Sequence, residues 1–177
     1  MRYSLHEVIL STLKTAMLLI LVEVFTSAIL PAIGINNFKP AFNVLIILYL
    51  AFKLEVPFLP FLILLFQYIH SVFSIEGWAA GTLAGILVSL SVKYVKDMLN
   101  FSTAASTIIV VQVFQIAWFV IMSLVLTIKL GDFSHFFTIF IKYLPESVFL
   151  SLVSYGFFKL LDRIWKPSKA SSSGVLL

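Results

Sequence analysis

An almost unbroken succession of apolar residues occupies positions 8 to 161, and charged residues stand almost only at the edges of the apolar blocks. Hydrophobic residues make up 61% of the chain and charged residues 11%, whereas an average soluble domain has roughly 45–50% apolar and about 25% charged residues. A soluble fold of this composition would have no polar surface. The pattern therefore predicts an all-α integral membrane protein.

The apolar blocks predict a six-helix transmembrane bundle, with spans at residues 8–30, 41–52, 57–73, 78–92, 104–128 and 145–161. Pro31 and Gly34 are expected to close the first span, and Pro145 is expected to open the last. The aromatic-rich residues 133–144 are expected to form a short interfacial segment before the last helix. Residues 1–165 then form a single transmembrane domain, and the Ser-rich residues 166–177 a disordered cytoplasmic tail.

The segment 41–52 is short for a full crossing, and the distribution of basic residues bears on whether it crosses. With six spans and both termini in the cytoplasm, nine of the twelve basic residues lie inside, and only Lys39, Lys129 and Lys142 lie outside. If 41–52 does not cross, the better five-span orientation has eight basic residues inside and four outside. Since basic residues favour the cytoplasmic side, six spans with both termini cytoplasmic are preferred.

Three polar residues in the predicted spans are candidates for function. Glu23 lies in the second half of the first span, where a charge exposed to lipid costs about 2.5–3.5 kcal/mol, so we expect it to be buried in the bundle. It either lies near the outer headgroups, forms a structural hydrogen bond to a neighbouring helix, or binds a ligand or partner. Gln67 and His70 share one helix face. They either form interhelical hydrogen bonds, or they gate protons or bind a substrate.

Two further sets of residues suggest close helix contacts. Gln112 and Gln115 lie three positions apart in the fifth span, where they either bond to a neighbouring helix or line an interior cavity with Glu23. Gly77, Gly81 and Gly85 follow one another at four-residue intervals. Such a face of small residues lets two helix backbones approach closely, either within the chain or between subunits.

Several classes of function lack their sequence signatures. The chain has no GxSxG or HExxH motif, no phosphate-binding glycine loop, and no evident set of nucleophile, base and orienting acid. His6, His70 and His135 do not have metal-ligand spacing, and the basic residues are too scattered for nucleic acid. We therefore expect no catalytic residues, no metal, no cofactor and no nucleic-acid partner. The remaining possibility is a helical bundle in membrane lipid that binds either an interior ligand or other proteins.

Three segments resemble the MreD family of bacterial rod-shape-determining membrane proteins. They are SAILPAIGINNFKPAFNVLIILYLAF, FLILLFQYIHSVFSIEGWAAGTLAGILVSL and PESVFLSLVSYGFFKLLDRIW, and the likeness extends over about residues 13–165. It rests on chain length, the spacing of the spans and weak motifs. Where that family commonly has an Asp before its Ser/Gly loop, this chain has His70 and Ser71, so no role of that acid is carried over.

The resemblance implies a non-catalytic scaffold of the cell-elongation and peptidoglycan-synthesis machinery, in the bacterial inner membrane. The partners it implies are MreC and, through MreC, the actin-like MreB, the glycosyltransferase RodA and a penicillin-binding transpeptidase. The alternative is the substrate-binding subunit of an energy-coupling-factor vitamin transporter, which is also a six-helix protein of about this size. Ala28 and Ala32 have the AxxxA spacing that such subunits use for docking, although Pro31 interrupts the pair.

Overall fold

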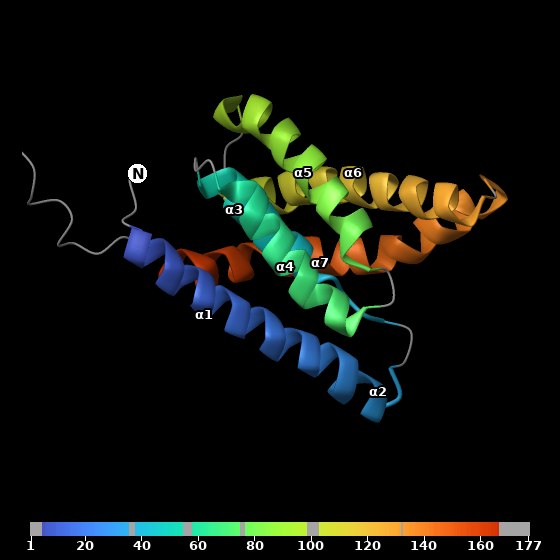
Figure 1. Cartoon of the computed structure of the whole chain (residues 1–177), viewed down its shortest axis with the longest axis horizontal. Coiled ribbons are helices and arrows are strands. Elements are labelled where there is room, and N and C mark those ends of the chain that lie inside the picture. The colour runs from blue at the N-terminus through green and yellow to red at the C-terminus, as the bar shows by residue number, and fades with distance from the viewer. Residues whose placement is uncertain are drawn as a thin grey trace, which may run out of the picture.

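The computed structural model describes residues 5–35, 38–54, 58–74, 77–98, 103–131 and 133–166, and the regular elements in these ranges are all helical (Figure 1). The elements are α1 (Leu5–Val24), the π-helix η1 (Phe25–Ile29), α2 (Leu30–Ala32), α3 (Phe42–Lys53), α4 (Leu59–Phe73), α5 (Trp78–Val95), η2 (Lys96–Met98), α6 (Ala104–Leu130), η3 (Phe133–His135) and α7 (Phe136–Ile164). The prediction of an all-helical chain is confirmed. Residues 167–177, which include nearly all of the predicted tail, lie outside the described ranges.

Within those ranges, four helices are long and apolar enough to cross a membrane: Leu5–Ala32, Trp78–Val95, Ala104–Leu130 and Phe136–Ile164. The two remaining apolar helices, α3 and α4, have 12 and 15 residues. At about 1.5 Å per residue, α3 is roughly 18 Å long, less than the roughly 30 Å hydrocarbon core of a bilayer.

We call α1, α3, α4, α5, α6 and α7 the six principal helices. The shortest of them, α3, lies at the centre of the bundle. Every residue from position 43 to 51 is buried, and α3 contacts α1, α4, α5, α6 and α7. A helix that is apolar on all sides is stable either in lipid or inside a bundle, and neighbouring helices bury this 12-residue helix.

Both described ends of the chain lie at the same end of the bundle. Ser11 Oγ donates a hydrogen bond to the Ile164 carbonyl (3.0 Å), and Trp165 Nε1 donates one to Thr15 Oγ1 (3.0 Å). Asp162 forms an ion pair with Lys53 (3.3 Å), which brings the end of α3 to the same place. We call this the N/C end and the opposite end the distal end. The six principal helices run alternately in opposite directions between them (Figure 1).

The first helix ends where Pro31 and Gly34 were expected to close it, since it passes Pro31 by one residue and stops at Ala32. Proline lacks an N–H and its ring clashes with the carbonyl four residues earlier, here that of Ser27. The π-helical turn directly before the proline widens the helix, and Leu30 N–H bonds to the Phe25 carbonyl. The helix ends at Ala32, and Gly34 in the following turn has a φ of 87°, which is accessible to glycine.

The prediction that Pro145 opens the last helix is wrong. Residues 136–144 form the first turns of α7, which runs through Pro145 without interruption. The proline leaves the Ile141 carbonyl without its usual helical donor. Lys142, which belongs to this segment, lines the cavity at the distal end that is described below.

Candidate functional site

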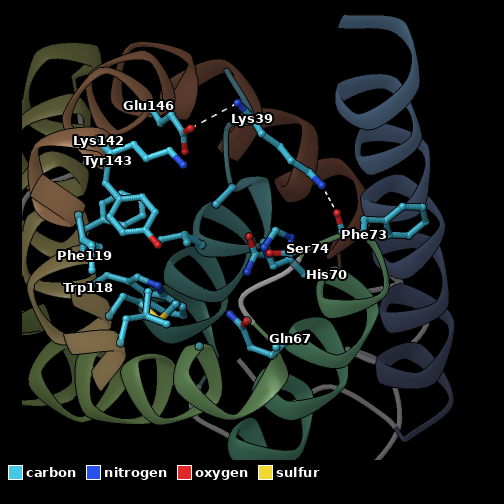
Figure 2. A pocket seen from close by; sticks show the side chains of 18 residues that line it. Lys39, Gln67, His70, Phe73, Ser74, Trp118, Phe119, Lys142, Tyr143 and Glu146 are labelled. Carbon is cyan, nitrogen blue, oxygen red and sulfur yellow. Dashed lines mark hydrogen bonds between the residues drawn. The ribbon is translucent and has the colours of Figure 1, made fainter. Parts of the chain in front are cut away.

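A cavity of about 580 Å³ lies at the distal end of the bundle (Figure 2). Residues from α3, α4, α5, α6 and α7, and from the segment before α3, line it. Its ionisable and amide side chains are those of Lys39, Asn43, Gln67, His70, Lys142 and Glu146. Gln67 and His70 are one turn apart on α4, so both predicted candidates do share one wall.

His70 also joins the cavity wall to the first helix. Its Nδ1 lies 2.6 Å from Oε1 of Glu23, and the two residues are 7% and 1% exposed. The predicted burial of Glu23 is confirmed. A buried polar group requires a hydrogen-bond partner, and removing one member of such a pair leaves the other unsatisfied. This contact therefore fixes α4 against α1 and orients the imidazole.

Lys39 extends along the mouth of the cavity and links two helices that are distant in the sequence. Its backbone N–H donates to Glu146 Oε1 (3.3 Å), and its ammonium group donates to the Phe73 carbonyl (Figure 2). The first contact reaches α7 and the second reaches the last residue of α4. Lys142, one turn before Glu146 on α7, adds a second cation to the same region.

The floor of the cavity is apolar and aromatic. Trp118, Phe119 and Met122 come from one face of α6. The Phe119 ring stacks on Tyr143 of α7, with 4.8 Å between ring centroids and 13° between ring planes. The cavity thus combines a flat apolar surface with a polar mouth, as small-molecule sites commonly do.

Two of the three predicted packing glycines hold the cavity's helices close together. A Cβ at Gly81 would lie 2.7 Å from Gln67 Cδ, and one at Gly85 would lie 2.7 Å from Ile63 Cγ2 and 2.9 Å from Trp118 Cη2. Both glycines therefore let α5 approach α4 and α6 of the same chain. Gly77 is different, because it precedes α5 with a φ of 77° and a Cβ there would meet no atom within 4 Å. The prediction that Gly77 belongs to the packing face is wrong.

Gln112 and Gln115 lie outside the cavity lining and join α6 to α7. Gln112 Nε2 donates to Ser147 Oγ (2.6 Å), and Ser151 Oγ donates to Gln115 Oε1 (3.2 Å). The structure therefore places the two glutamines in a helix interface and does not bring them together with Glu23. Of the two interpretations offered by the sequence, interhelical bonding fits them.

Sequence reasoning missed Lys39, Asn43, Trp118, Lys142, Tyr143 and Glu146 as cavity residues. One available signal was that Lys39 and Lys142 were two of only three basic residues expected on the outer side. Their convergence depends on contacts such as that between Lys39 and Glu146, which are 107 positions apart. Within the described ranges, no group of three or more His, Cys, Asp or Glu residues is placed to hold a metal ion.

No protein-family model matches this chain, and neither a curated protein nor a solved structure matches it significantly.

Proposed function

We propose that this chain is a six-helix protein of the bacterial inner membrane that acts, as MreD does, as a non-catalytic scaffold of the cell-elongation machinery. The observation that carries the proposal is the arrangement of the helices. Six principal helices alternate in direction, and the described ends of the chain meet at the N/C end. This arrangement agrees with the layout that the resemblance over residues 13–165 implies.

The charge distribution supports a cytoplasmic N/C end. Of the ten basic residues that the structure describes, Lys39, Lys129 and Lys142 belong to the distal half of their helices or loops, and the other seven belong to the N/C half. Basic residues are retained on the cytoplasmic side of bacterial membranes. In this orientation α3 crosses inside the bundle, where its neighbours bury residues 43–51, whereas α4 crosses at its surface with Phe61 and Val72 exposed.

The helices also offer surface for partner proteins. Only 28% of the most apolar stretch of the helix Leu5–Ala32 is buried by the rest of the described chain. Apolar residues such as Leu13, Met17 and Leu21 are exposed on this helix. Lipid or an apolar partner helix can cover such a face. Following the resemblance, we propose MreC as the direct partner and MreB, RodA and a penicillin-binding transpeptidase as partners reached through MreC.

Depletion of the protein in its rod-shaped host tests this function. We expect cells to become round, because a scaffold of elongation is needed to maintain the rod. Re-expression of the intact chain should restore the rod shape. Cells that keep their shape after complete loss of the protein would contradict the proposal.

A second candidate, the substrate-binding subunit of an energy-coupling-factor vitamin transporter, is favoured by one specific observation, the cavity of about 580 Å³. Ala28 and Ala32 are also exposed, and the helix continues through Pro31, so the AxxxA pair stays helical. Neighbouring genes distinguish the two candidates. MreB and MreC genes favour the scaffold, whereas an ATPase gene and a vitamin pathway favour the transporter.

A further inference from the structure

The cavity wall contains two buried polar atoms that lack a partner among the described residues. They are Nε2 of Gln67 on α4 and Oδ1 of Asn43 on α3, and each residue is 2% exposed. The Gln67 nitrogen is a hydrogen-bond donor, and the Asn43 oxygen is an acceptor. Unsatisfied buried polar atoms are costly, and more so within a membrane, where water is scarce. Because both side chains line the same cavity, a molecule bound there can accept a hydrogen bond from Gln67 and donate one to Asn43.

The charges around the cavity favour an anion. Lys39 and Lys142 contribute two cations to the lining, and Glu146 contributes one carboxylate. His70 faces the cavity but is already paired with Glu23 through its Nδ1. At the mouth of the cavity, the two lysines and the one carboxylate therefore leave an excess of one positive charge. A ligand with one negative charge would be neutralised there.

The apolar lining and the volume of the cavity indicate what the uncharged part of the ligand is like. Trp118 and the stacked pair of Phe119 and Tyr143 present aromatic surface, and Met122 lies beside them. Aromatic walls of this kind pack against flat apolar groups. A volume of about 580 Å³ falls within the range of roughly 300–1,000 Å³ that is usual for small-molecule sites.

We infer that this cavity binds a small organic anion with a flat apolar body and an amide or hydroxyl group. Its acidic group lies near Lys39 and Lys142, its polar group meets Gln67 and Asn43, and its body packs on Trp118. The anion comes either from a dissolved molecule or from the headgroup of an anionic lipid. The inference goes beyond the proposed scaffold function and does not depend on it.

Matched pairs of probes test the charge preference. The full-length protein is placed in phosphatidylcholine nanodiscs, and dissociation constants are measured by calorimetry for N-acetyltryptophan and N-acetyltryptophanamide, and for benzoate and benzamide. Each pair differs in one negative charge. We expect the anion of at least one pair to bind about tenfold or more tightly than its neutral partner, as one charge-assisted hydrogen bond would give.

Three variants assign that preference to the cavity. Lys142→Gln should remove most of it, and the exposed position of Lys142 makes this change safe for folding. Lys129→Gln is the matched control, because Lys129 is an exposed lysine in the last turn of α6 that does not line the cavity. Gln67→Met, which nearly preserves side-chain shape, should weaken both members of a pair by about tenfold through loss of the amide.

A lipid arm distinguishes the two sources of the anion. If an anionic headgroup is the occupant, phosphatidylglycerol nanodiscs should abolish probe binding to the parent, and native mass spectrometry should show a retained phosphatidylglycerol that Lys142→Gln loses. If no probe shows an anion preference and no lipid is retained, or if Lys129→Gln acts like Lys142→Gln, the inference is wrong. That outcome leaves the scaffold proposal standing, since its test is cell shape.

Discussion

Replacing Glu23 by leucine should destabilise the protein by about 3 kcal/mol, because the change leaves a buried hydrogen-bonding group of His70 without its partner. The structure supplies the reason. Glu23 Oε1 lies 2.6 Å from His70 Nδ1, and the two residues are 1% and 7% exposed, so neither solvent nor salt can replace the lost partner. Glu23→Gln keeps an oxygen that can accept from Nδ1–H. It should therefore cost much less, about 1–2 kcal/mol.

The appropriate assay is the free energy of unfolding in a fixed detergent or bilayer, measured for the parent, Glu23→Leu, His70→Leu and the double variant. Because the two side chains are each other's main polar partner, the double variant should be more stable than the sum of the single effects predicts, by about 1–3 kcal/mol. Additive effects, or a Glu23→Leu variant as stable as the parent, would refute the reasoning.

Other changes test particular contacts. Gly85→Ala should destabilise by about 1–3 kcal/mol in an unfolding assay, because its Cβ would lie 2.7 Å from Ile63 Cγ2. Its matched control, Gly156→Ala, should stabilise α7 by about 0.5–1 kcal/mol, since a Cβ there meets no atom within 4 Å; destabilisation of both variants alike would contradict this explanation. Trp165→Phe should cost about 1 kcal/mol through loss of the hydrogen bond to Thr15, and an unchanged unfolding midpoint would show that this bond does not hold the end of α7. Reporter tags at the N terminus and after residue 165 should both be cytoplasmic, and a periplasmic N terminus with a cytoplasmic C terminus would leave only five spans.

The helices were largely predictable because the apolar blocks are separated by charges, prolines and glycines. The unbroken helix through Pro145 was not. That proline was interpreted as a helix boundary, as it would be in a soluble protein. In the membrane proposed above, the alternatives to a helix would expose backbone polar groups to lipid, which favours the π-helical turn before Pro31 and the unbroken helix through Pro145.

The candidate site was predictable only in part, for a similar reason. The unfavourable burial of Glu23 and the shared face of Gln67 and His70 follow from local spacing. The pairing of Glu23 with His70 joins positions 47 apart, and nothing in either segment specifies the other. Asn43 was not predicted as a site residue, because a single amide at the start of an apolar block is common and does not indicate a function. It becomes informative only when its unpartnered Oδ1 is located in a cavity wall.

The most direct test of the scaffold function is affinity purification of the intact protein from membranes of its own host, under conditions that preserve complexes of membrane proteins. The account predicts that MreC co-purifies in a stable ratio. It also predicts that Lys142→Gln, which changes only the rim of the cavity, leaves this association intact. Protein that is free of MreC but retains a tightly bound vitamin, from a host whose shape survives deletion of the gene, would contradict the scaffold and establish the transporter subunit in its place.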